Sequence, residues 1–179
     1  TNWAVNRALR FLERRDPTRP FFLTLSFIAP HPPLQPPAFY LDRYLRTGVP
    51  DPVIGDWEKA PEFGKGGRTV ENTAPDMINL TGEALLSTRA AYYGLINHID
   101  DQIRRVLNPV TGIQRMTKNN TIGMFTSDHG EMLGDHYMWR KSRVYEPSAR
   151  VPLLISAPQR FELKPTSVVD LPCTHADMM

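Results

Sequence analysis

The sequence has a single cysteine, no long apolar run and almost no excess of either charge. Cys173 has no second thiol to pair with, which excludes an internal disulfide framework. No apolar stretch approaches the roughly 20 residues that a membrane-spanning helix needs, so no membrane partner is expected. The net charge is only +2 and acidic residues dilute the arginine-rich start, so no nucleic-acid partner is expected. These features predict a soluble protein of undetermined compartment, compatible with the periplasm or with secretion.

The length and composition fit one globular domain. Hydrophobic residues make up 41% of the 179 positions and charged residues 22%, which is typical of soluble domains and excludes a disordered chain or a coiled coil. We therefore expect a single domain over residues 1–179. Proline is unevenly placed, with 11 of the 17 prolines between Pro17 and Pro75. Residues 47–80 are therefore predicted to form a long loop insertion, either facing a substrate or solvated at the surface.

Apolar residues at helical spacing predict two helices. The first covers residues 2–15 and ends at Asp16, before a proline. The second covers residues 82–107 and ends at Asn108, again before a proline. Short apolar runs predict three buried strands, at residues 20–30, 121–126 and 151–156. Strands alternating with long helices indicate an α/β fold, with a largely parallel or mixed sheet flanked by helices.

Residues just beyond the carboxyl ends of such strands are where ligands collect. Asp128 and His129 follow the second predicted strand, and Gly130 allows the backbone to turn so that both side chains can meet one ion. Three further polar side chains come within a few positions, namely Glu131, Asp135 and His136. This density of potential ligands indicates a metal site. The alternative is a solvated acidic loop.

His31 and Lys141 are the other candidates. His31 lies between prolines after the first predicted strand, a stiff position from which an imidazole could donate a proton to a leaving oxygen or bind an anionic ester. Lys141 follows Asp128 by 13 residues and could neutralise an oxyanion. The alternatives are a loop histidine and a solvated lysine. His98 and His175 are interpreted as structural.

Taken together, these segments resemble the sulfatases of the alkaline phosphatase superfamily. The resemblance covers nearly the whole chain. It depends on the strand that leads into the Pro-His-Pro-Pro run around His31, the Ser-Asp-His-Gly-Glu run that begins at Ser127, and the Trp-Arg-Lys run that ends at Lys141. It implies an incomplete sulfatase-like domain of a sulfuric ester hydrolase.

The resemblance also implies roles for four residues. Asp128 and His129 would be metal ligands, Lys141 would bind a sulfate oxygen, and His31 would contact the sulfate or assist the leaving group. The cofactor would be one divalent metal, usually calcium, with manganese or zinc also open. The substrate would be a sulfate ester of a small molecule or a sulfated glycan. Glu131 would orient the loop, and His136 would either order that loop or pack in the core.

Two family features are missing from these residues. The cysteine form of the formylglycine segment, Cys-x-Pro/Ala-x-Arg, is missing, because Cys173 is not followed by the required residues. The run Ser156-Ala-Pro-Gln-Arg fits the letters of the serine form, but it begins inside the third predicted strand. The only consecutive aspartates, Asp100 and Asp101, lie in the middle of a predicted helix and do not match the family's acidic metal ligands. We therefore expect an internal piece of a longer enzyme that alone binds metal weakly, lacks activity and self-associates through exposed sheet edges.

Two other functions remain open at the level of sequence. A phosphonate monoester or phosphate diester hydrolase of the same superfamily would share the same residues. A non-catalytic module that binds a metal or a sulfated glycan is the alternative from a different class.

Overall fold

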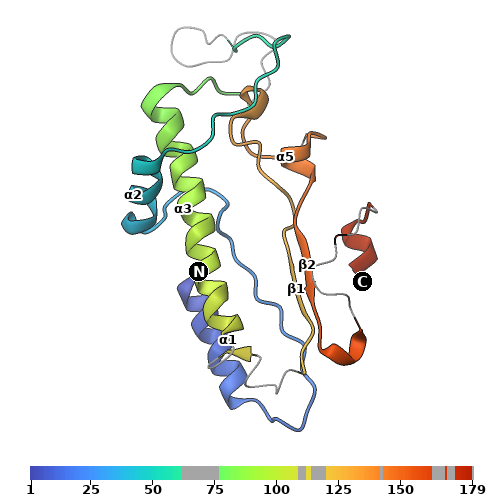
Figure 1. Cartoon of the computed structure of the whole chain (residues 1–179). Helices are drawn as coiled ribbons and strands as arrows, with labels where there is room; N and C mark the ends of the chain where they lie inside the picture. Colours follow the sequence, from blue (N-terminus) through green and yellow to red (C-terminus); the bar gives the residue numbers. More distant parts are fainter. Residues whose placement is uncertain are drawn as a thin grey trace.

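A computed structural model describes residues 1–61, 77–108, 112–113, 120–141, 143–162, 168 and 172–178. Three longer helices, α1 (Asn2–Arg14), α2 (Ala38–Thr47) and α3 (Gly82–Leu107), lie together on one side of the molecule. On the other side, β1 (Gly123–Thr126) and β2 (Leu153–Ser156) form a two-stranded ribbon. The shorter helices are η1 (Asp135–Tyr137), α5 (Glu146–Ala149), η2 (Gln159–Phe161) and η3 (His175–Met178). Figure 1 shows this separation of helices and ribbon.

The two predicted helices are confirmed as α1 and α3. Val5, Ala8 and Leu12 are the buried residues of α1, one face of the helix at the spacing seen in the sequence. Val5 and Leu12 form a small core with Val106 from the far end of α3. The helix α2 was not predicted, because the prolines around it favour loops. It packs on α3, where Tyr40 donates a hydrogen bond to Asp101 at 2.8 Å.

Residues 21–28 alternate strictly between half-buried and exposed side chains, as in a strand with one covered face. Phe21, Leu23, Leu25 and Phe27 pack against the core of α1 and α3, whereas Phe22 is 92% exposed. The predicted first strand, buried on both faces, is therefore wrong in the described part of the chain. The segment is extended but has no strand beside it there with which to pair.

The other two predicted strands exist, but they pair antiparallel to one another, with Gly123 opposite Ser156 and Thr126 opposite Leu153. An antiparallel pair is compatible with the mixed sheet that the sequence left open, and excludes an entirely parallel one. The prediction that both strands are buried is also wrong, because every β1 residue and most of β2 are exposed. The mixture of helices with a small sheet agrees with an incomplete α/β domain.

Residues 48–61 contain no helix or strand, which agrees with the loop predicted there. Whether the whole of 47–80 is an insertion stays a prediction, since residues 62–76 lie outside the described ranges. Among the described helices, none has the length and apolar character required to cross a bilayer.

Candidate active site

The candidate site begins where β1 ends. Directly after the strand, the hydroxyl of Ser127 donates to the carbonyl of His129 at 2.7 Å, which bends the chain. The bend brings Nε2 of His129 to 3.6 Å from Oδ2 of Asp128. The Asp128 side chain is 88% exposed. The two predicted metal ligands therefore share one small region of space, although they are consecutive in the sequence.

A backbone carbonyl fixes the tautomer of His129. Nδ1 of the ring lies 2.7 Å from the carbonyl oxygen of Gly130. Because a carbonyl can only accept, Nδ1 carries the proton and Nε2 of the neutral ring keeps a free lone pair. A lone pair on one nitrogen, with the other nitrogen hydrogen-bonded, is the state in which histidine binds a metal.

His31 is held in the same way and lies beside His129. Its Nδ1 donates to the carbonyl of Pro32 at 2.8 Å, which leaves Nε2 as an acceptor. The two imidazole rings meet edge to face, with 6.2 Å between their centroids. Nε2 of His31 accepts a hydrogen bond from Nζ of Lys141 at 2.9 Å. The structure therefore brings together all four predicted site residues, in the order Asp128, His129, His31, Lys141.

This arrangement places one positive charge, that of Lys141, in a cluster with two imidazoles and one carboxylate. The Lys141 ammonium has three donors, of which His31 takes one, so the others remain for an anionic oxygen. An anion at this position would be bound by charge-assisted hydrogen bonds, which are stronger than neutral ones. The site can therefore bind a tetrahedral anion and move a proton between lysine and histidine.

The loop after His129 returns the chain to Lys141. Gly130 donates to Ser148 and Glu131 donates to Pro147, both at 2.8 Å from nitrogen to oxygen. A Cβ on Gly130 would lie 2.0 Å from the carbonyl oxygen of Pro147. Gly130 is therefore needed for this close approach of two backbones. That it also allows the turn after the strand stays a prediction, since its φ is not positive.

Asp135 and His136 attach residues 53–58 to this loop. Oδ1 of Asp135 accepts from the backbone N–H of Val53 at 3.0 Å. Nδ1 of His136 lies 2.8 Å from a carboxylate oxygen of Glu58, and its ring stacks on Tyr145 with 4.3 Å between centroids. His136 therefore helps to order the loop. Its ring also packs against Tyr145, so the two roles that the sequence left open are not exclusive.

Sequence reasoning missed the partners of this loop. Arg89 of α3 is buried, donates to the carbonyl of Leu133 at 2.5 Å and lies 3.8 Å from Asp135. Neither Arg89, in the predicted helix 82–107, nor Glu58, in the predicted loop 47–80, was among the candidates from the sequence. A charged residue at a buried position would have pointed to both of them. A single sequence does not show which charged residues are buried.

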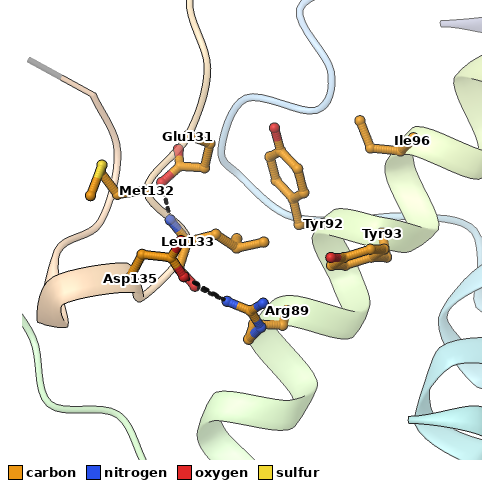
Figure 2. A pocket seen from close by; sticks show the side chains of 8 residues that line it. All are labelled: Arg89, Tyr92, Tyr93, Ile96, Glu131, Met132, Leu133 and Asp135. Carbon is orange, nitrogen blue, oxygen red and sulfur yellow. Dashed lines mark hydrogen bonds and ion pairs between the residues drawn. The ribbon is translucent and has the colours of Figure 1, made fainter. Parts of the chain in front are cut away.

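A hollow of about 300 Å³ lies between α3 and this loop. Figure 2 shows its lining, with Tyr92 and Arg89 reaching from the helix toward Glu131 and Leu133. Burial raises the pKa of Tyr92 to about 12, and the negative charge of Glu131 and then Tyr93 add to the effect. Tyr92 therefore keeps its proton at neutral pH on the helix side of the loop.

The described residues do not by themselves complete a metal site. No group of three or more His, Cys, Asp or Glu side chains in the described ranges could hold a metal ion. Asp128 and His129 offer one carboxylate and one nitrogen, whereas calcium takes roughly six to eight oxygen ligands. The pair fits as part of a ligand set, and further ligands would have to come from elsewhere.

The remaining histidines have structural partners. His98 is buried, its Nε2 lies 2.9 Å from Oδ1 of Asn2, and its ring lies beside Tyr40. Burial lowers the pKa of His98, and the negative charge of Asp101 opposes this effect. Nε2 of His175 donates to the carbonyl of Ser127 at 2.7 Å, so the tail touches the end of β1. Cys173 is exposed and lies in this tail.

Comparison with known proteins identifies the family. A sequence model of the Sulfatase family matches residues 2–179. Over 158 residues the chain is 48% identical to an arylsulfatase of Clostridium perfringens, covering 88% of this chain and 32% of the relative. It is 31% identical to a choline-sulfatase of Rhizobium meliloti, covering 97% of this chain and 35% of the relative. The chain thus spans about a third of the length of these curated relatives.

A solved structure agrees with the sequence comparisons. The phosphonate monoester hydrolase of Agrobacterium radiobacter superposes with a TM-score of 0.64 at 30% identity, covering 86% of this chain and 32% of that one. This likeness confirms the predicted class, an incomplete sulfatase-like α/β domain. The family match over nearly the full chain, together with the gathering of Asp128, His129, His31 and Lys141, leads to one conclusion: the chain belongs to the sulfatase family.

Proposed function

We propose that the full-length protein containing this chain hydrolyses sulfate monoesters, and that this chain contributes the part of the active site that binds the sulfate and serves the leaving group. The observation that carries the proposal is the contact between Lys141 and His31, 2.9 Å apart although 110 residues separate them in the sequence. No structural need of a loop explains a lysine held on a histidine at an exposed position. A sulfate oxygen would be a further acceptor for the N–H groups of Lys141.

Lys141 is the group that binds the ester in this proposal. A sulfate monoester carries a full negative charge, and its oxygens would accept the two N–H groups of Lys141 that His31 leaves unused. As the ester S–O bond breaks, charge develops on the departing oxygen. A fixed ammonium near that oxygen stabilises the transition state more than the ground state, which is what lowers the barrier.

The hydrogen bonds of His31 decide the direction of proton transfer. With its proton on Nδ1 and its Nε2 lone pair facing Lys141, neutral His31 has no proton to give at Nε2. We assign to Lys141 the proton that reaches the departing oxygen, either directly or by way of Nε2 of His31. The products are then a neutral alcohol or phenol and a neutral lysine, which regains its proton from water after release. The predicted assistance of His31 to the leaving group is kept, with Lys141 as the proton's source.

We also propose a nucleophile and a metal for this site. The attacking group would be a formylglycine in a segment outside these residues, because the cysteine form of that segment does not occur in them, and Ser156, which begins a Ser-Ala-Pro-Gln-Arg run, is paired with Gly123 in the ribbon. Asp128 and His129 would supply two ligands of a divalent metal, calcium first, with manganese or zinc as alternatives. When bound, such an ion supplies positive charge to the ester oxygens. The free lone pair on Nε2 of His129 and the exposure of Asp128 support this assignment.

The substrate class follows from the relatives. Arylsulfatase and choline-sulfatase are names of enzymes that act on sulfate esters of small molecules, and we extend this class to the present protein, with sulfated glycans as a further possibility. A second candidate is hydrolysis of phosphonate monoesters, which the likeness to the Agrobacterium radiobacter enzyme favours at 30% identity. A phosphonate monoester is also a tetrahedral anion, so the same lysine could bind it.

Parallel turnover assays with the full-length protein test the proposal. The protein is given a chromogenic aryl sulfate and the matching aryl phosphonate monoester under identical conditions, with and without added calcium. The proposal predicts a higher kcat/KM for the sulfate. A higher value for the phosphonate would favour the second candidate, and hydrolysis of neither ester would favour a binding module.

A further inference from the structure

Glu131 holds the chain just before Lys141. One oxygen of its carboxylate, Oε1, accepts the backbone N–H of Leu133 at 3.2 Å and also the backbone N–H of Arg140. The carbonyl of Arg140 in turn accepts the N–H of Met132 at 2.7 Å. Both backbone polar groups of Arg140 are therefore tied to the residues that follow His129. Lys141 is the next residue, so these bonds fix where its side chain starts.

The two residues that Glu131 binds have an unfavourable backbone conformation. Leu133 has φ of 50° and Arg140 has φ of 69°, both in the left-handed region that side-chain-bearing residues rarely adopt. Such conformations persist where the surroundings hold them in place, and they gather at functional sites. The same carboxylate oxygen accepts from both strained residues, which makes Glu131 the group that closes the loop from His129 to Lys141.

A second hold acts from the helix side. The guanidinium of Arg89 binds the carbonyl of Leu133, and Figure 2 shows this contact and the bond from Leu133 to Glu131 on opposite sides of the same residue. Glu131 therefore binds the N–H of Leu133, and Arg89 binds its carbonyl. Arg89 fixes the beginning of the loop to α3, whereas the Glu131 carboxylate, together with the bond from Met132 to the Arg140 carbonyl, connects that beginning to Arg140.

From these contacts we infer that Glu131 is a positioning residue for Lys141 in ester hydrolysis. The inference rests on the proposed function. The described hydrogen bonds of its carboxylate go to backbone N–H groups, so Glu131 acts through the loop rather than on the substrate. Since a single oxygen makes both bonds, glutamine can replace glutamate and still accept from Leu133 and Arg140. Alanine cannot.

A double-mutant cycle in the full-length protein tests this inference. Glu131→Ala is expected to lower kcat for the better of the two esters by about ten- to a hundredfold, because Lys141 is displaced from its place. Glu131→Gln is expected to keep most of the activity. In a Lys141→Ala background, Glu131→Ala should cause no further loss, because its effect passes through the lysine. Glu146→Ala is the matched control, since Glu146 is an exposed carboxylate whose ion pair is with the exposed Arg150.

The opposite results are equally clear. If the losses from Glu131→Ala and Lys141→Ala multiply in the double variant, Glu131 acts by another route and the inference is wrong. If Glu131→Gln is as damaging as Glu131→Ala, the charge and not the hydrogen bonds matters, which also overturns it.

Amide hydrogen exchange separates this inference from the proposed function. In the full-length protein the Arg140 amide should be protected from exchange, lose that protection in Glu131→Ala and keep it in Glu131→Gln. This result would support the hold on Lys141 even if the protein hydrolysed neither ester. Unchanged protection in Glu131→Ala would overturn the inference even if the protein proved to be an active sulfatase.

Discussion

His31 and His129 each donate the Nδ1 proton to a carbonyl of the adjoining backbone, at 2.8 and 2.7 Å. This local contact decides the chemistry of both rings, because it leaves both Nε2 atoms as acceptors. Nε2 of His129 is then free to bind a metal, and Nε2 of His31 is free to receive a hydrogen bond from Lys141. Two imidazoles with the same internal geometry thus take different roles according to the group that faces Nε2.

Tyr92 gives a prediction at the residue scale that concerns pH. Its pKa is about 12, raised from an ordinary value of 10.0, with burial as the largest cause and the charge of Glu131 next. Between these two pH values the unfolded chain loses the tyrosine proton and the folded chain keeps it. This group therefore makes folding stability fall as the pH rises from about 10 to about 12, and has no effect below about 10.

Ultraviolet titration checks the prediction for Tyr92. The tyrosinate absorbance assigned to Tyr92, by difference from Tyr92→Phe, should appear near pH 12 in the unaltered protein. It should appear at a lower pH in Glu131→Gln, because one of the causes has been removed. An identical titration in both proteins would show that the charge of Glu131 does not reach Tyr92.

Gly130 gives a second prediction at this scale. Gly130→Ala places a Cβ 2.0 Å from the carbonyl oxygen of Pro147, so the two backbones must move apart and their hydrogen bonds must lengthen. The expected loss in the free energy of unfolding is about 1–3 kcal/mol, as for other overpacked sites. Gly123→Ala is the control, since no atom lies within 4 Å of the added Cβ. Chemical denaturation compares the two variants, and equal stabilities would refute the close contact.

At the residue scale, the sequence indicates the side chains of the site but not what holds them. His31, Lys141, Asp128 and His129 were identified by motif and spacing, and the structure brings them together. The carbonyls that set the tautomers could not be predicted, because they depend on ring orientation. The attachment of His136 to Glu58 spans 78 positions and leaves no local pattern in the sequence.

At the scale of elements, the helices and strands that could be predicted were those with a regular spacing of apolar residues. The helix α3 begins and ends at the predicted residues, because a 26-residue apolar stripe with a proline just beyond its end is a strong local signal. The segment 21–28 shows the alternation of a strand but lacks a partner in the described residues, since pairing depends on distant chain. The antiparallel direction of β1 and β2 was likewise invisible, because apolar runs do not encode direction.

The segment 53–58 supplies a prediction at this scale. Glu58 is almost buried and accepts from the N–H of Gly55 at 2.6 Å and from His136 at 2.8 Å. Glu58→Ala removes both bonds, so this segment should detach from the loop that leads to Lys141. Faster amide exchange over residues 50–61 is the expected result. Asp56→Ala, an exposed acid in the same segment, serves as the control and should leave exchange unchanged. Equal exchange in both variants would contradict this role for Glu58.

At the scale of the whole molecule, the ribbon is the least covered part. Met124, Phe125, Leu154 and Ile155 are between 41% and 63% exposed, on both faces of the ribbon, and both ribbon edges lack a partner strand within the described residues. Apolar residues on both faces are typical of a strand inside a larger sheet. The chain spans about a third of its curated relatives, so covering elements in a longer protein are compatible with this exposure.

The exposed ribbon predicts self-association of the chain when it is made alone. Sedimentation velocity at increasing concentration should show species larger than a monomer. Leu154→Glu should reduce the association by placing charge on the ribbon, whereas Val168→Glu, a charge at an exposed valine outside it, should not. A chain that stays monomeric at high concentration would contradict this prediction. The isolated chain is also expected to hydrolyse no aryl sulfate.

The most direct test of the account is a double-mutant cycle between His31 and Lys141 in the full-length protein, with kcat/KM for an aryl sulfate as the measured quantity. The account predicts that Lys141→Ala lowers this value by about 10²–10³-fold and His31→Ala lowers it by a similar factor. It also predicts that kcat/KM of the double variant is close to that of the less active single variant, because the two residues act as one unit. Lys59→Ala, at an exposed lysine, should have no effect. Unchanged activity in either single variant, or losses that multiply in the double variant, would contradict the account.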